Sequence, residues 1–192
     1  MPNLKILSMN ANSITGKLNL IKCYAETYNP DLVCICETKI SDTFDDNELL
    51  GDKFTLWRKD RAQGAGGVLI AMKNDSDAKV LDSKSGPGEC VIIKLQIHDK
   101  IVFNVVTFYR PPSEYELDNL KEIIETYSEA NSSIVVGDFN LPDIVWSADP
   151  PHVKPTSNRK ALHQRALDII TEADLVQFVH EPTHRLGNTL DL

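Results

Sequence analysis

A carboxylate and an amide stand two residues apart at the end of an apolar segment. Residues 134–137 favour a buried strand, and Asp138 and Asn140 follow it. Side chains two residues apart share one face of an extended chain, so these two can project together. An aspartate can take a proton from water, and an asparagine amide can donate a hydrogen bond to a phosphate oxygen. A second reading stays open, because Asp and Asn after a strand also form simple turns.

Polar residues also follow other apolar segments, where each would be a poor core residue. They are Asn10, Glu37, Tyr109 and Asp191. Strand ends at one edge of stacked sheets can meet at one pocket, so we expect these side chains to gather with the first pair. Taken singly, each also fits a turn, a strand-end charge or a rim aromatic. Carboxylates, amides and a phenol offer hard oxygen ligands, which suit Mg²⁺ or Mn²⁺ and not zinc.

The composition is that of an ordinary globular chain. Its 192 residues suffice for one sizeable α/β domain, with 42% apolar and 25% charged residues. A net charge of −8 argues against a passive nucleic-acid coat protein, but not against an enzyme that grips phosphates locally. The sequence shows no signal peptide, no transmembrane segment and no zinc-type cysteine spacing. We therefore expect an intracellular protein, cytoplasmic or nuclear, with no membrane partner.

The spacing of apolar residues predicts more strands than helices. Strands are expected at 4–9, 32–36, 54–57, 68–72, 90–97, 101–108, 134–137 and 176–179, with another beginning at 189–192. Helices are expected at 17–28 and 158–173, and a third should open at a capping box over 113–116. Residues 42–52 read as an acidic loop, 98–100 as a hairpin loop and 142–156 as irregular chain. Neighbouring strands that can pair as hairpins favour two sheets with helices outside them.

Five short motifs carry a resemblance to a known superfamily. They are Met9-Asn10-Ala11-Asn12, Ile35-Cys36-Glu37-Thr38, Phe108-Tyr109-Arg110-Pro111-Pro112, Gly137-Asp138-Phe139-Asn140 and Thr189-Leu190-Asp191-Leu192. With these motifs in order, the sequence resembles the endonuclease/exonuclease/phosphatase superfamily over essentially its whole length. It looks most like the endonuclease domains of non-LTR retrotransposons, and residues 58–61 followed by 64–68 look like that branch too. The resemblance implies a DNase I-like four-layer α/β sandwich, in which two packed β-sheets are flanked by helices, as a single domain over 1–192.

The resemblance also implies roles for individual residues in a Mg²⁺-dependent (or Mn²⁺-dependent) phosphodiesterase. Glu37 would be a metal ligand with Asn10 beside it. The catalytic set would be Tyr109 at the scissile phosphate, Asp138 at the attacking water, Asn140 at a phosphate oxygen, and Asp191 as the acid that pairs with a catalytic histidine. Substrate contacts would come from Arg58, Arg61, Arg110 and, more loosely placed, Thr183. Hydrolysis of a phosphodiester needs in-line attack by an activated water, with a cation on the developing charge.

The sequence departs from the family at its end. The family continues into strands that carry Ser-Asp-His, and no histidine here, His184 included, stands in that context. We therefore expect the last strands to be missing, through truncation or decay, and activity to be impaired. Three hypotheses follow. The first is a DNA-nicking endonuclease with a reverse transcriptase downstream in the same polyprotein. The second is a phosphodiesterase or phosphatase acting on lipid or inositol phosphates, and the third is a catalytically dead domain that binds DNA or a protein.

Overall fold

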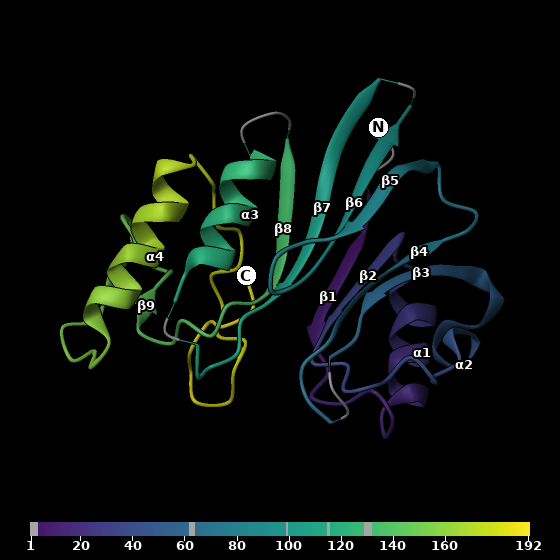
Figure 1. Cartoon of the computed structure of the whole chain (residues 1–192), viewed down its shortest axis with the longest axis horizontal. Coiled ribbons are helices and arrows are strands. Elements are labelled where there is room, and N and C mark those ends of the chain that lie inside the picture. Colours follow the sequence, from purple (N-terminus) through teal and green to yellow (C-terminus); the bar gives the residue numbers. More distant parts are fainter. Residues whose placement is uncertain (1–3, 62–63, 99, 115, 129–131) are drawn as a thin grey trace.

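Two four-stranded sheets form the centre of the protein. The computed structural model describes residues 4–61, 64–98, 100–114, 116–128 and 132–192 (Figure 1). The first sheet has the order β1 (Ile6–Asn10), β2 (Leu32–Cys36), β4 (Val68–Lys73) and β3 (Phe54–Lys59). The second has the order β5 (Ala78–Ser85), β6 (Glu89–Ile97), β7 (Ile101–Tyr109) and β8 (Ser133–Asp138). A short antiparallel pair joins β9 (Ile144–Val145) to β10 (His152–Val153).

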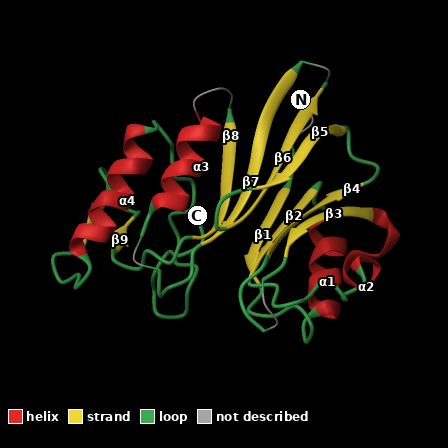
Figure 2. Ribbon diagram, in the orientation of Figure 1, coloured by secondary structure: helices red, strands yellow, loops and turns green. Residues whose placement is uncertain are grey.

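Helices cover the outer face of each sheet, which gives four layers (Figure 2). The helical elements are α1 (Leu18–Tyr28), α2 (Asp46–Leu50), the 3₁₀ turn η1 (Gly51–Lys53), α3 (Asp118–Ser128) and α4 (Lys160–Glu172). One apolar cluster lies between the first sheet and α1, a second between the two sheets, and a third between the second sheet and α3 with α4. The predicted α/β sandwich of two packed sheets flanked by helices is confirmed. None of the helices in the described part of the chain is long and apolar enough to cross a membrane.

Two parallel strand pairs set the position of the polar residues. β1 pairs with β2 in parallel, and β7 pairs with β8 in parallel, each pair being connected through a helix. The carboxyl ends of parallel strands meet at one edge of a sheet. Asn10 and Glu37 therefore share one edge, and Tyr109 and Asp138 share another. Because β1 also contacts β8 across the two sheets, the two edges lie together.

Local sequence explains where several elements stop. Helix α1 ends at Asn29, which adopts φ 45° and donates its N–H to the Ala25 carbonyl, and Pro30 follows. Helix α2 begins after Asp45, whose carboxylate accepts the Asn47 N–H at 2.9 Å. Every residue of β2 is buried, as expected of a strand covered on both faces.

Some predicted elements differ from the structure. Residues 176–179 form no strand in the described chain, and the predicted acidic loop contains α2. Helix α3 starts at Asp118, well after the predicted cap at Ser113. The predicted capping box includes Tyr115 and the predicted hairpin loop includes Asp99, and both residues lie outside the described ranges.

Candidate functional site

A cavity of about 580 Å³ opens where β1, β2 and β8 end. Six of the residues singled out from the sequence line it: Asn10, Glu37, Asp138, Asn140, Thr183 and Asp191. They come from both sheets and from the last segment of the chain. The structure therefore brings together most of the predicted site.

Asn10 joins the two sheets at the floor of this site. Its Nδ2 donates to Glu37 Oε1 at 2.9 Å and to Asp138 Oδ2 at 2.7 Å. Its Oδ1 accepts the Asn12 N–H at 2.9 Å, which fixes the direction of the amide. One side chain thus sets the spacing of the two carboxylates.

Asp138 is a buried acid with its charge only partly compensated. Burial and the neighbouring charge of Asp191 raise its pKa to about 6, although hydrogen bonds from Asn10 and the Asn140 N–H favour the charged form. The Asn140 N–H donates to Asp138 Oδ1 at 2.9 Å. A carboxylate whose pKa lies near neutrality is suited to accept a proton from water.

Asp191 enters the site from the last residues of the chain. Backbone bonds between Gly137 and Leu192 (3.1 and 2.9 Å), with Phe139 N–H to Leu190 O at 2.9 Å, lay this segment along β8. Thr183 Oγ1 accepts the N–H groups of Leu190 and Asp191 at 2.9 and 3.0 Å. Burial raises the pKa of Asp191, and its Oδ1 has no hydrogen-bond partner among the described residues.

The backbone around the cavity is unusually strained. Asn12, Ser13, Glu37, Lys39 and Asn140 have φ between 42° and 79°, and they are five of the eight described non-glycine residues with positive φ. Such residues persist only where their surroundings impose the conformation, and they gather at functional sites. Asn tolerates this conformation in simple turns, so it is the strain at Glu37 and Lys39 that supports a functional reading of the polar cluster.

The donor set around Glu37 fits a hard divalent cation. Burial disfavours the charged form of Glu37, but hydrogen bonds from Asn10 and Lys39 and the Lys39 charge outweigh it and lower its pKa. The Lys39 ammonium lies 3.0 Å from Glu37 Oε2, so a positive charge already contacts this carboxylate. Within the described residues, no three Asp, Glu, His or Cys side chains form a preformed cage. Mg²⁺ is often held by one or two carboxylates together with substrate phosphates and several waters, and Glu37, with Asn10 beside it, fits that donor set.

Tyr109 is buried next to Glu37, with 6% of its surface exposed. Burial and the charges of Glu37 and Asp138 raise the pKa of the phenol, which stays protonated at neutral pH and can act as a donor. Tyr109 is not among the described residues that line the cavity.

Two of the predicted substrate contacts are structural residues instead. Arg110 is 1% exposed, and its guanidinium donates to the carbonyls of Phe139 (3.3 Å), Asn140 (3.2 Å) and Glu114. Arg58 pairs with Asp46 (3.2 Å) and Asp60 (3.5 Å) and donates to two loop carbonyls. Neither guanidinium is available to a substrate in this arrangement.

Arg61 is the exposed arginine of the predicted set. It is paired with Glu89 at 3.0 Å, with about half of its side chain in solvent. The structure also adds residues that the sequence did not single out. Asn12 and His184 line the cavity, and Lys39 contacts Glu37. Only Asn12 had a sequence signal, as part of the first motif.

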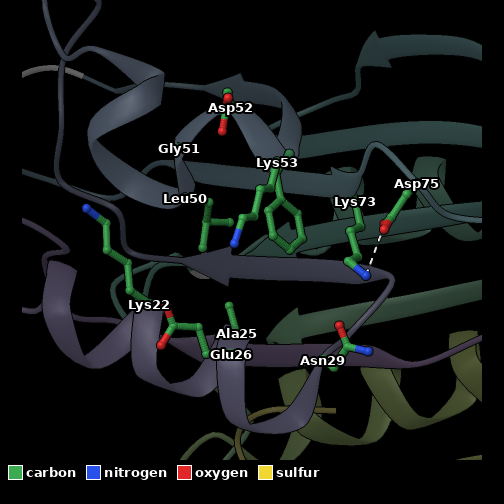
Figure 3. A pocket seen from close by; sticks show the side chains of 11 residues that line it. Lys22, Ala25, Glu26, Asn29, Leu50, Gly51, Asp52, Lys53, Lys73 and Asp75 are labelled. Carbon is green, nitrogen blue, oxygen red and sulfur yellow. Dashed lines mark ion pairs between the residues drawn. The ribbon is translucent and has the colours of Figure 1, made fainter.

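A second pocket of about 550 Å³ lies elsewhere (Figure 3). It lies at the opposite end of the strands of the first sheet from Glu37. Phe54, which lines this pocket, pairs with Lys73 at one end of β4, whereas Cys36, next to Glu37, pairs with Val68 at the other end. Its three lysines are balanced by three acids, and Lys73 is bound to Asp75 at 3.0 Å. The pocket lacks the coupled carboxylates of the first cavity.

Comparisons with known proteins agree with this fold. Residues 103–192 match a family described as endonuclease-reverse transcriptase. The fold is similar to the endonuclease domain of TRAS1, a telomere-specific non-LTR retrotransposon, with 14% identity, a TM-score of 0.67, and 99% of this chain and 83% of that chain covered. No curated protein gives a significant sequence match.

Two further solved structures share the fold as well. An AP endonuclease from Archaeoglobus fulgidus aligns with 21% identity and a TM-score of 0.64, over 88% of this chain and 70% of that one. A 3′ phosphatase from Neisseria, bound to a product DNA hairpin, aligns with 18% identity and a TM-score of 0.61, over 87% and 71%. The second half of the chain thus matches an endonuclease-reverse transcriptase family, and the chain as a whole has the DNase I-like fold of these nucleases and phosphatases.

Proposed function

We propose that this protein is a divalent-metal-dependent endonuclease that nicks one strand of DNA, of the kind found in non-LTR retrotransposons. The observation that carries the proposal is the Asn10 bridge, which holds the Glu37 and Asp138 carboxylates at a fixed spacing in one cavity. The similar fold of a retrotransposon endonuclease and the matched endonuclease-reverse transcriptase family support this branch. A reverse transcriptase in the same polypeptide is part of the proposal.

Each residue of the proposed site has a separate role in the reaction. Glu37, with Asn10, would hold Mg²⁺ or Mn²⁺, which supplies positive charge to the developing phosphorane. Asp138 accepts a proton from the attacking water, because each carboxylate oxygen keeps a lone pair beyond its present bond. Tyr109 is proposed to donate to the scissile phosphate.

Asn140 and Asp191 complete the proposed site. One N–H of the Asn140 amide is bound to the Arg110 carbonyl at 2.7 Å, and the amide has a second N–H for a phosphate oxygen. Asp191 keeps a buried oxygen in the cavity that has no hydrogen-bond partner among the described residues, and this oxygen can orient a proton donor. Thr183 positions Asp191, and Arg61 remains a proposed contact to the DNA backbone.

A plasmid-nicking assay tests the function. The protein should convert supercoiled plasmid to the open circle in Mg²⁺ or Mn²⁺, and EDTA should stop the reaction. Lipid and inositol phosphates, assayed beside it, should release little phosphate. Phosphate release from these substrates without nicking would favour the alternative phosphatase function, and neither activity would favour a domain that only binds.

A further inference from the structure

We propose that the Lys39 ammonium is the resident counter-ion of Glu37, that a divalent cation displaces it on binding, and that the released ammonium then binds a DNA phosphate. The inference rests on the proposed function and adds a residue to it. Lys39 would be a positioning residue for the metal step and a contact for the substrate.

Lys39 is held by two groups that belong to the cavity. Its Nζ lies 3.0 Å from Glu37 Oε2 and donates to Asn12 Oδ1 at 2.5 Å. The exposed fractions of the Lys39 and Glu37 side chains are 25% and 18%, so solvent screens the pair only in part. Glu37 and Asn12 both line the cavity, so the ammonium is bound to two of its lining residues, although Lys39 is not itself among the described residues that line it.

The backbone of this segment is fixed on two sides. The Glu37 and Thr38 carbonyls accept the Ser13 and Ile14 N–H groups at 2.8 and 3.1 Å. On the other side, the Thr38 and Lys39 N–H groups donate to Gly67 and Gly66 at 3.1 and 2.9 Å. Glu37 and Lys39 are held at φ 51° and 53° by these bonds. The approach of Lys39 to Glu37 is therefore built into the fold.

The two oxygens of Glu37 are not equivalent. Oε1 accepts the Asn10 amide at 2.9 Å, and Oε2 carries the Lys39 ammonium. A cation that binds both oxygens of Glu37, or Oε2 alone, meets the ammonium at Oε2. The ammonium and the cation then compete for one oxygen, and the displaced ammonium remains beside a cavity that would hold an anionic phosphate.

Titration with Mn²⁺ tests the displacement, with free Mn²⁺ counted by electron paramagnetic resonance. Lys39→Met should bind Mn²⁺ about 3- to 5-fold more tightly than the wild type, the size expected for one partly screened ion pair. Lys39→Arg keeps the charge and should bind like the wild type. Lys17→Met is the matched control. Lys17 donates to the Ala11 and Asn12 carbonyls of the same loop, and its substitution by Met changes the net charge equally. An unchanged affinity in Lys39→Met, or an equal rise in Lys17→Met, overturns the displacement.

DNA binding gives a second readout that moves the opposite way. In saturating Ca²⁺, which we use to limit cleavage, Lys39→Met should bind a short DNA duplex about 3-fold more weakly, since one phosphate contact is lost. Structural damage would weaken Mn²⁺ and DNA binding together, and that result contradicts the inference. A wild type that nicks DNA while Lys39→Met shows neither change overturns this inference alone. A wild type that does not nick overturns the proposed function, whereas the Mn²⁺ titration still decides the displacement.

Discussion

At the scale of single residues, the site is a set of charges held apart by one amide. Asn10 donates to both Glu37 and Asp138, and Asp191 adds a third, partly buried acid nearby. Burial and the negative charge of Asp191 disfavour ionisation of Asp138, whose pKa rises to about 6. The burial and charge repulsion that raise the pKa of Asp138 suit it to act as a base. The same two effects should make the folded protein less stable once this carboxyl is ionised.

The pH dependence of stability follows from that shift. The pKa of Asp138 rises from 3.8 to about 6, so the folded state binds more protons than the unfolded state between these values. The free energy of unfolding should therefore fall by about 1–3 kcal/mol as pH rises through this window. Urea unfolding without divalent metal should show this fall in the wild type and a smaller one in Asp138→Asn. Asp191 contributes to both proteins with the same sign, so equal pH slopes would contradict the assigned pKa.

Arg110 is predicted to act on Asn140 and not on DNA. Arg110→Met would leave the buried carbonyls of Phe139 and Asn140 without donors, at a cost of about 2–4 kcal/mol in unfolding free energy. Urea denaturation would measure the loss, and Arg61→Met, which changes an exposed arginine, should cost less than about 1 kcal/mol. An Arg110→Met protein of normal stability with weak DNA binding would return Arg110 to the substrate contacts.

The sequence predicted which polar residues share the cavity better than it predicted where long side chains point. Asn10, Glu37, Asp138 and Asn140 follow strands, and strand ends converge in this kind of fold. The resemblance implied that Arg110 contacts the substrate, but the direction of a long side chain is not readable from its neighbours in sequence. Lys39 gave no signal, because its contact with Glu37 depends on two left-handed backbone positions.

At the scale of elements, the close approach of β7 and β8 positions Asp138. Gly137 has φ 141°, and a Cβ there would lie 1.9 Å from the Phe108 carbonyl oxygen. No L side chain fits without pushing the two strands apart. The glycine before Asp138 is thus a packing requirement that sets where β8 delivers its carboxylate.

Gly137→Ala should therefore lower the unfolding free energy by about 3 kcal/mol or more and abolish nicking. Gly187→Ala is the control, because Gly187 also has positive φ (80°) but open space around it, and should cost about 1 kcal/mol. Thermal unfolding of both variants measures the difference. Similar losses in the two proteins would show that backbone strain, and not the clash with Phe108, matters at Gly137.

Elements with strong local patterns were predicted well, and the others were not. The strand at Leu32–Cys36 and the helix ending at Tyr28 were expected within a residue of their observed bounds. β5 was missed because most of its residues are polar and exposed. Residues 176–179 have the apolar alternation of a strand, yet in the described chain they pair with none, and Val176 and Phe178 are 71% and 84% exposed.

At the scale of the whole molecule, an apolar groove of about 390 Å³ runs between the edges of β1 and β8. Val176 and Phe178 lie on one of its walls, and Ile134 of the β8 edge is also partly exposed. Exposed apolar surface next to an edge strand favours association. The average molecular mass of the wild type in solution should rise with protein concentration, because the molecules associate. The double variant Val176→Ser/Phe178→Ser should associate less.

Light scattering over a concentration series measures the effect. Leu81→Ser is a suitable control, because Leu81 is a 50% exposed apolar residue on β5, away from the groove. A wild type that stays monomeric throughout, or a control that reduces association as much as the double variant, would contradict the role of the groove.

Because the net charge is −8, the DNA binding that we propose depends on local groups and on the proposed metal. Removing an acid from the cavity should then leave DNA binding unchanged or slightly stronger. Removing the group that activates water should instead slow the chemistry. Asp138 is both an acid of the cavity and the proposed base, so its removal should slow cleavage without weakening DNA binding.

The most direct test is single-turnover nicking and equilibrium DNA binding by Asp138→Ala, with the folded fraction measured by circular dichroism. Asp168→Ala, an exposed acid on α4, serves as the control. We predict that Asp138→Ala cleaves at least ~10²-fold more slowly, the usual size of a general-base contribution, while its DNA affinity holds or rises. Cleavage at the wild-type rate by folded Asp138→Ala would contradict the account.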